Sequence, residues 1–425
     1  MPRLVQHIRQ LEPQRLDRLV WPVWLVTRLL VLGLVLGISR GRASEMQDIA
    51  YYLEVARHVV DTGSLPTDAM WQYPPGAALV LVIPLAAGSA AYGITFVLLM
   101  FACDAGITRL LTGAARDHGS RIGVWAWLLA MPWLREYPPL RFDLLPTLLA
   151  VAALLWLGRR PLLAGALAGI GVLVKAWPLV VLAAEWHPRR LVRASVALVA
   201  TLAVGLVAAS ALHGPIDSAL QNRDGRGLQV EAIAATPWHA SAIAHGTTAE
   251  ARWGNGSWDL VDERANDVAT ALDALTGAAA LLVGLTWIIT LRRARASGTW
   301  PSRAAGFDLA FVALLTAIAT SKVLSPQFLI WLLALAAVCL SCRDTRMRTA
   351  ALLVVASTIP TFFVLDSPIA IVIRNLLLVA ALLAAWRGAL DSARRGGQAS
   401  TTTSSERSST SSTRSPSAST SAATS

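Results

Sequence analysis

The segment 48–75 begins with Asp48-Ile49-Ala50-Tyr51-Tyr52 and ends with Tyr73-Pro74-Pro75. It follows an apolar run over residues 20–38 that is long enough to cross a bilayer. The next apolar run, 76–90, is short and contains Pro84. This order predicts a membrane span, an acidic group at the membrane surface, and a chain that then dips back towards the bilayer without crossing it.

The composition indicates the broad class of protein. Hydrophobic residues make up 55% of the 425-residue chain, and apolar runs recur from residue 20 to residue 386. A soluble domain with a single core does not repeat such runs, whereas a polytopic helical membrane protein does. The runs are continuous and lack the alternation that a barrel wall needs. We therefore expect an all-α polytopic membrane protein.

About twelve transmembrane helices are expected, with residues 76–90 as a re-entrant or interfacial element in the first outer loop. Several runs are shorter than the roughly 20 residues that cross the hydrocarbon, and helices of that kind persist only inside a bundle. The expected spans are 20–38, 92–111, 122–134, 144–157, 161–174, 175–186, 193–212, 268–290, 305–320, 325–340, 349–365 and 370–386.

Basic residues predict the orientation of the chain. They precede the first span, recur in alternate loops and follow the last span, and an excess of Lys and Arg marks cytoplasmic loops. Both termini of this multi-pass cell-membrane protein are therefore predicted to be cytoplasmic. If 76–90 crossed completely, every later basic loop would lie outside. The net charge of +11 is thus a topology signal, and no nucleic-acid partner is expected.

Two regions follow from this topology. Residues 1–395 form one membrane domain, with a large extracytoplasmic loop at 213–267. Residues 396–425 are almost all Ser, Thr, Ala, Gly and Arg, a composition that cannot bury a core, so a disordered cytoplasmic tail is expected there.

Lysine usage is unusually selective. Among 37 basic residues, only Lys175 and Lys322 are lysines, and both are expected at the outer ends of helices. A compact ammonium group suits a phosphate, whereas arginine presents a planar fork. The alternative is that both side chains reach to the membrane interface.

Other polar residues at the outer boundary also allow two interpretations. Asp48 is either a catalytic acid or the N-cap of an interfacial helix. Asp143 either pairs with Arg141 or caps a helix, or it binds sugar hydroxyls. Asp48 and Asp143 could also share a divalent ion. Tryptophans 238, 253 and 258 either anchor the loop 213–267 or stack on sugar rings, which would make that loop an acceptor-site lid.

The order of these features resembles the GT-C superfamily of membrane glycosyltransferases, and in particular glycosyltransferase family 87, the polyprenyl-phosphate-mannose-dependent α-mannosyltransferases and their relatives. Some relatives carry a His-rich motif where this chain has Lys322 and Ser325-Pro326-Gln327. The resemblance covers residues 15 to 390, and it is carried by Asp48, Tyr73-Pro74-Pro75, Arg141-Phe142-Asp143, Lys175-Ala176-Trp177-Pro178, Arg226 to Glu231, Lys322 to Phe328 and Arg374-Asn375.

The resemblance implies an inverting hexosyltransferase at the extracytoplasmic face, with mannose as the first expectation. The donor would be a polyprenyl-phosphate sugar and the acceptor a glycolipid or a polysaccharide, with no metal and no cofactor. Asp48 would be the general base. The alternatives are an arabinofuranose or glucose donor on the same fold, and a transporter or lipid flippase. The expected substrate-binding residues are Tyr73, Arg141, Asp143, Lys175, Arg226, Glu231, Lys322, Gln327 and Arg374.

Overall fold

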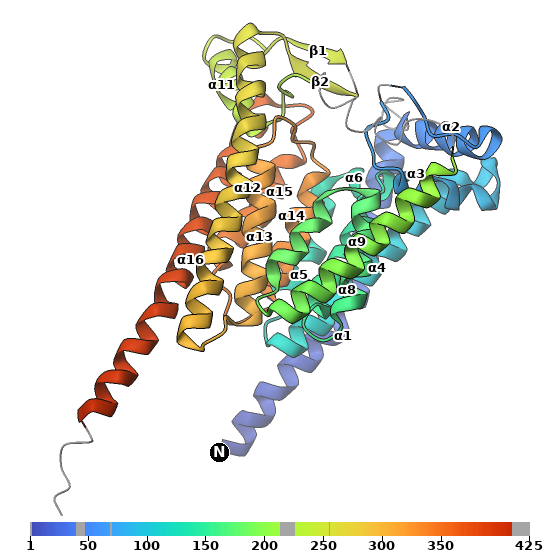
Figure 1. Ribbon diagram of the computed structural model, residues 1–425. Coiled ribbons are helices and arrows are strands. Elements are labelled where there is room, and N and C mark those ends of the chain that lie inside the picture. Colours follow the sequence, from blue (N-terminus) through green and yellow to red (C-terminus); the bar gives the residue numbers. More distant parts are fainter. Residues whose placement is uncertain (1, 40–46, 69, 213–225, 255, 410–425) are drawn as a thin grey trace, which may run out of the picture.

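The computed structural model describes residues 2–39, 47–68, 70–212, 226–254 and 256–409. These residues form a helical bundle with one two-stranded hairpin at one end (Figure 1). The first half contains α1 (Pro2–Ser39), α2 (Gln47–Thr62), α3 (Gly76–Val82), η2 (Ile83–Ala87), η3 (Ser89–Ala91), α4 (Tyr92–His118), α5 (Ile122–Ala130), η4 (Met131–Leu134), α6 (Tyr137–Leu140), α7 (Leu144–Trp156), α8 (Pro161–Val174), η5 (Trp177–Ala184) and α9 (Pro188–Ser210).

The second half begins with a small outer region and continues with long helices. Its elements are η6 (Ile233–Ala235), α11 (Thr236–Ala244), β1 (Ala251–Gly254), β2 (Ser257–Leu260), α12 (Glu263–Ser297), α13 (Arg303–Ala319), α14 (Phe328–Leu340), α15 (Arg348–Thr361) and α16 (Pro368–Ser409). Part of the sequence-predicted loop 213–267, residues 213–225, lies outside the described residues. Of the tail 396–425 that was predicted to be disordered, residues 396–409 belong to helix α16 in the structure, and residues 410–425 also lie outside the described residues.

Five helices in the described residues are long and apolar enough to cross a membrane. Every sequence-predicted span coincides with a helical element, although 175–186 forms the 3₁₀ helix η5. The mainly helical membrane fold is therefore confirmed, while the count of twelve spans stays a prediction. The five long segments are Leu16–Gly37, Ser89–His118, Pro188–Ser210, Glu263–Ser297 and Pro368–Asp391.

The short helices lie inside the bundle and the long ones lie outside. In α14 every side chain from Leu329 to Leu340 is buried. In the most apolar windows of α9 and α12, only 11% of the residues are buried. A short helix keeps its ends away from lipid when neighbours surround it, which explains why this chain tolerates apolar helices of 13 or 14 residues.

The segment after the first span folds back at one end of the bundle, where α2 lies across the long helices (Figure 1). Gly76 begins α3 against the end of α8, so close that an added Cβ would lie 2.7 Å from the carbonyl oxygen of Leu173. Only glycine permits this approach. Gly76–Ala87 is a shorter apolar helix, as expected for an element that does not cross, although its depth in a membrane stays a prediction.

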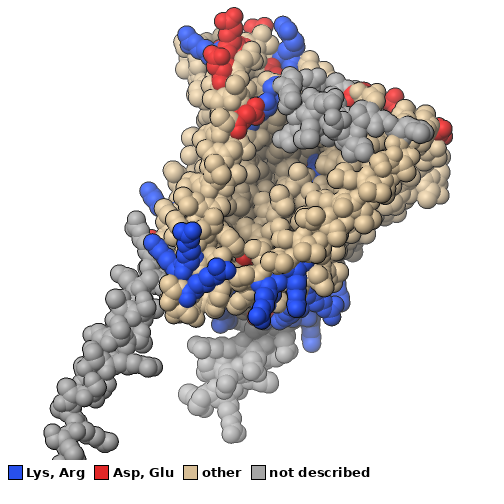
Figure 2. Space-filling model, in the orientation of Figure 1, with Lys and Arg blue, Asp and Glu red and all other residues tan. Residues whose placement is uncertain are grey.

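Residues 226–254 and 256–272, here called the head, form a second small core around the first turns of α12 (Figure 1). In the hairpin Trp253 pairs with Trp258, and both are half exposed. At the opposite end of the molecule Figure 2 shows a concentration of Lys and Arg. The head and the basic loops thus lie at opposite ends, as the charge pattern predicts.

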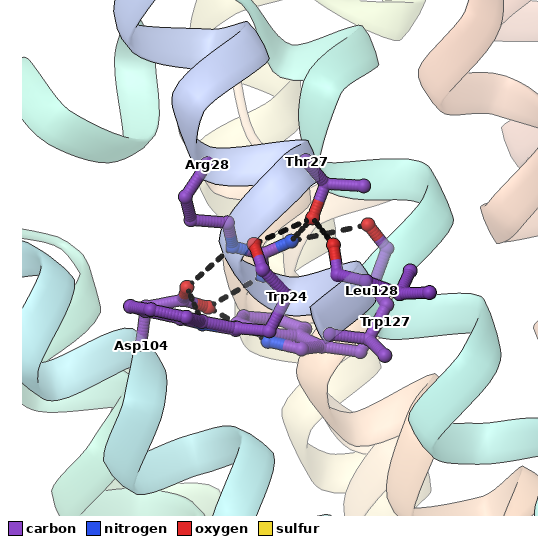
Figure 3. Close-up of polar contacts among 7 residues, drawn as sticks. Trp24, Thr27, Arg28, Asp104, Trp127 and Leu128 are labelled. Carbon is purple, nitrogen blue, oxygen red and sulfur yellow. Dashed lines mark hydrogen bonds and ion pairs between the residues drawn. The ribbon is translucent and has the colours of Figure 1, made fainter. Parts of the chain in front are cut away.

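A buried charged network ties the first span to the bundle (Figure 3). Arg28 donates to both carboxylate oxygens of Asp104, at 2.5 and 2.8 Å, and also to the carbonyl of Leu128. The indoles of Trp24 and Trp127 donate to the same carboxylate at 2.6 and 2.8 Å. Asp104 is therefore satisfied by four hydrogen bonds, which identifies it as a link between α1, α4 and α5.

We expect Arg28→Met to lower the thermal stability of the purified protein, because it leaves the Asp104 carboxylate buried and without its counter-charge. Loss of one partner of a buried pair costs about 3–5 kcal/mol. The double variant Arg28→Met/Asp104→Leu should recover most of that loss. As the control, Asp117→Asn breaks the exposed pair with Arg159 and should change stability by less than about 1 kcal/mol. An equal loss of stability in Arg28→Met and Asp117→Asn would contradict the structural role of the Arg28–Asp104 pair.

Candidate functional site

Asp48 lies in the first turn of α2 and contacts Arg141, which follows α6. An Nη atom of Arg141 lies 2.6 Å from a carboxylate oxygen of Asp48. The Asp48 side chain is 29% exposed and that of Arg141 24% exposed, so this ion pair is open to a ligand. The sequence placed both residues at the outer boundary, and the structure brings them together.

Asp143 and Lys175 form a second ion pair beside the first, and this one is buried. The ammonium of Lys175 donates to Asp143 Oδ1 at 2.6 Å, and the side chains are 8% and 1% exposed. Trp331 of α14 donates its indole N–H to the same oxygen at 2.8 Å. One carboxylate oxygen thus joins the start of α7, the end of α8 and α14.

Three aromatic rings surround the Lys175 ammonium. Its nitrogen lies 4.8 Å from the ring centre of Phe142, 5.2 Å from that of Trp331 and 5.5 Å from that of Tyr73. Cation–π attraction of this kind is strongest where water is excluded. Tyr73 comes from the Tyr73-Pro74-Pro75 segment, so the ammonium also holds this return loop against the bundle.

Two buried polar atoms at this place have no hydrogen-bond partner among the described residues: the Tyr52 hydroxyl and Asp143 Oδ2. Gln327 Oε1, at the start of α14, is also buried without one. Tyr52 lies one helical turn after Asp48, and its phenol lies near enough to Asp48, Arg141 and Asp143 for their charges to affect its pKa. Gln327 lies one turn before Trp331. Buried polar groups are almost always paired, so a polar ligand is expected here.

The electrostatic environment of Asp48 suits a proton acceptor. Burial raises the pKa of its carboxyl group above the ordinary value, Arg141 lowers it, Asp143 raises it and Lys175 lowers it. The net direction is upward. A carboxylate with a raised pKa is a stronger base.

Glu231 and Arg374 form a buried link next to this site. Arg374 donates to the Glu231 carboxylate at 2.8 Å and to its carbonyl at 2.5 Å. Asn375 donates to the carbonyl of Ala232 at 3.1 Å, so α16 holds the start of the head. The Tyr137 phenol is close enough to both Glu231 and Arg141 for their charges to affect its pKa.

Lys322 and Arg226 lie elsewhere. The Lys322 ammonium pairs with Asp273 of α12 at 2.9 Å, and the Asp273 side chain is 62% exposed. Arg226 lies in the head, where its Nη2 atom would be 3.8 Å from a Cβ added to Gly256. Of the sequence-predicted residues, the structure therefore gathers Asp48, Tyr73, Arg141, Asp143 and Lys175 and places Glu231 and Arg374 next to them. Gln327 lies one turn before Trp331, Lys322 pairs with Asp273, and Arg226 lies in the head.

Sequence reasoning missed two residues of this region and one outside it. Tyr52 was not among the expected site residues, although its i+4 spacing from Asp48 places both on one helix face. Trp331 has the same spacing from Gln327. Asp273, the partner of Lys322, carries no local signal, because 49 residues separate the pair.

The comparison with protein families supports the resemblance over part of the chain. Residues 71–224 match the model of glycosyltransferase family 87. This stretch contains Tyr73, Arg141, Asp143 and Lys175, but it stops short of Asp48 on one side and of Gln327 on the other. No curated protein matches the chain. The match and the apolar helices together indicate a membrane glycosyltransferase, with a sugar donor and an acceptor as its substrates.

Tyr52→Phe should leave the free protein as stable as the wild type or stabilise it, by up to about 1–3 kcal/mol, because it removes a buried hydroxyl without a partner. Tyr92→Phe is the matched control. Tyr92 has the same 1% exposure, but its hydroxyl donates to the carbonyl of Leu81 at 3.0 Å. That variant should lose roughly 0.5–1.5 kcal/mol. Thermal unfolding of both variants measures the difference, and a larger loss in Tyr52→Phe would show that the hydroxyl is already paired.

Proposed function

We propose that this protein is an inverting hexosyltransferase that moves a sugar, mannose as the first candidate, from a polyprenyl-phosphate donor to a glycolipid or polysaccharide acceptor at the extracytoplasmic face. The observation that carries the proposal is the accessible Asp48–Arg141 pair beside the buried Asp143–Lys175 pair. Two unpartnered polar atoms, the Tyr52 hydroxyl and Asp143 Oδ2, belong to this region, and much of the site lies in the stretch that matches glycosyltransferase family 87.

Asp48 serves as the general base in this mechanism. Its free carboxylate oxygen accepts the proton of an acceptor hydroxyl while that hydroxyl oxygen attacks the anomeric carbon. A new bond between the anomeric carbon and the acceptor oxygen forms as the bond to the phosphate oxygen breaks. The bonding electron pair leaves with the lipid phosphate, and attack from the opposite face inverts the anomeric centre.

Arg141 is the first candidate to bind the leaving phosphate. A guanidinium group has five N–H donors, and the contact with Asp48 uses one side of this fork. Lys175 adds positive charge from behind Asp143. Lys322 reaches the phosphate in this proposal only after it leaves Asp273, and an ion pair with so exposed a partner costs little to open. Arg374 acts through Glu231 by holding the head in place.

The sugar ring occupies the space next to the unpartnered atoms. Asp143 Oδ2 and Gln327 Oε1 accept hydrogen bonds from sugar hydroxyls. The Tyr52 phenol stays protonated, because burial raises its pKa far above the ordinary value, so it can donate or accept. The half-buried Tyr73 ring, which packs on Phe142, provides the apolar wall against which a sugar face packs.

A lipid tail has a place on the surface below this site. Figure 2 shows a hollow between the parts of the surface formed by α12 and α9, and its walls are almost entirely uncharged. Both helices expose large apolar side chains, among them Val199 and Val207 of α9 and Leu281 and Leu285 of α12. A polyprenyl chain lies there while its phosphate reaches the polar end of the bundle.

The proposal includes neither a metal nor a cofactor. Both carboxylates of the site are held by cations, and no third acidic, His or Cys side chain among the described residues joins them in a group that could hold a metal ion. The basic end of the molecule faces the cytoplasm with both termini, and the Asp48 site faces the opposite side.

Transfer of radiolabelled mannose from polyprenyl-phosphate mannose to membrane acceptors tests the reaction. We expect Asp48→Asn to reduce the rate about 10²–10⁴-fold, because loss of a general base has that effect. Asp61→Asn, an exposed acid on the same helix α2, should retain full activity and serves as the control.

If the wild type consumes polyprenyl-phosphate arabinose or glucose but not the mannose donor, only the sugar assignment is wrong. If it moves a lipid across vesicles without consuming any donor, the transporter or flippase alternative replaces the proposal. If Asp48→Asn transfers sugar as fast as the wild type, Asp48 is not the base.

The pH dependence of transfer separates the two neighbours of Asp48. Arg141 lowers the pKa of Asp48 and Asp143 raises it. Arg141→Met should therefore move the acid limb of kcat/KM to higher pH, because the base ionises later. Asp143→Asn should move the limb to lower pH. The two midpoints are read from pH profiles, whatever the remaining activity, and shifts of the same sign would contradict the assignment of Asp48 as the titrating group.

A further inference from the structure

The head carries a cleft that the proposed reaction does not use. It has a volume of about 450 Å³ and opens between the β1–β2 hairpin and the first turn of α12. Its lining includes Gly227, Trp253, Asp259, Asp262 and Asn266. A volume of this size is in the range of small-molecule binding sites.

The acidic side chains of the cleft are fixed before any ligand arrives. Asp259 accepts hydrogen bonds from the Gly227 N–H at 3.1 Å and from the Ser257 hydroxyl at 2.8 Å. Asp262 accepts from the Trp238 indole at 2.9 Å and from the Arg264 N–H at 2.7 Å. An ionised carboxylate has about four acceptor positions, so each retains capacity for ligand hydroxyls.

Trp253 supplies an apolar surface in the same cleft. Its side chain is 52% exposed although it belongs to a paired strand. It packs edge-to-face against Trp258, with ring centres 5.5 Å apart, which fixes its orientation. A held indole beside fixed carboxylates and an amide provides stacking for the apolar face of a sugar ring and hydrogen bonds for its hydroxyls.

The charge of the cleft selects among sugar ligands. Asp259, Asp262 and Glu263 line it, against the single basic side chain of Arg252. This excess of negative charge repels a phosphate or a uronic acid. The lipid-phosphate donor is therefore a poor ligand for the cleft, whereas an uncharged saccharide is not repelled.

The cleft is connected to the Asp48 region through one short segment. Gly227 lines the cleft, Leu228 and Val230 pair with strand β2, and Glu231 contacts Arg374. Gln229 accepts from the Leu324 N–H at 2.8 Å and donates to the Lys322 carbonyl at 3.0 Å. The head and the hydrogen-bonded loop before Gln327 therefore form one continuous structure at the same end of the molecule as α2 (Figure 1).

We propose that this cleft is a secondary saccharide site that holds an uncharged glycan of the acceptor away from the reacting hydroxyl. The proposal rests on the glycosyltransferase assignment above and adds the class of acceptor: a neutral oligosaccharide longer than one sugar. The cleft takes part in acceptor binding and not in the transfer step.

Binding of α-linked mannotetraose to the purified full-length protein, followed by isothermal titration and by ligand-detected NMR, tests the proposal. Trp253→Ala should weaken binding about tenfold, because an aromatic contact contributes up to about 1.5 kcal/mol. Trp258→Phe is the matched control, since Trp258 has the same 52% exposure but does not line the cleft. A phenyl ring keeps the edge-to-face contact that orients Trp253, so this variant should bind within about twofold of the wild type. Trp253→Phe should restore most of the affinity, which separates stacking from misfolding of the hairpin.

Two further measurements separate this site from the reaction. The inactive variant Asp48→Asn should bind mannotetraose as the wild type does, so the cleft can be confirmed even if the transfer assay fails. In an active enzyme, Trp253→Ala should raise KM for the acceptor about tenfold and leave KM for the lipid donor unchanged. Three results would overturn the proposal: no binding of mannotetraose by the wild type, an equal loss of affinity in Trp253→Ala and the Trp258 control variant, or tighter binding of an oligogalacturonate than of mannotetraose.

Discussion

The buried contact between Asp143 and Lys175 is the interaction on which the site depends. Separating two opposite charges that are buried this deeply has a high cost in free energy, because removal of either leaves the other buried without its counter-charge. The contact fixes the end of α8 relative to the start of α7, and Trp331 adds α14 to the same carboxylate oxygen. The ammonium then holds the loop that carries Tyr73. Four separate segments of the chain are placed by one pair of charges.

The membrane explains why this arrangement lies where it does. Short helices such as α14 are surrounded by other helices, while α9 and α12 are left largely exposed at the periphery. The ends of the short helices can therefore stop below the surface without exposing their backbone to lipid. Polar side chains that project from those ends meet in the protein interior. In the proposed reaction, this arrangement lets a hydroxyl acceptor and a lipid-linked donor meet at one point.

Much of this organisation could be predicted from local sequence patterns. The apolar runs predicted the helices, and the selective use of lysine indicated Lys175 as a special position. The hydrogen-bonded partners could not be predicted, because they come from distant parts of the chain: Trp331 is 156 residues after Lys175, and Asp273 meets Lys322 across 49 residues. Both lysines were expected to contact phosphate, yet each has an acidic partner in the structure. A single sequence specifies the charge of a residue far better than it specifies the group that neutralises that charge.

The two hydrogen bonds of Gln229 have a consequence for how the molecule could be controlled from outside. They attach the head to residues 322–324, and Gln327 follows three residues later at the site. An antibody fragment that clamps the hairpin would therefore restrain this loop from a distance, without contacting Asp48 or Arg141. The head is a region through which a large ligand can act on a loop that otherwise packs among the helices.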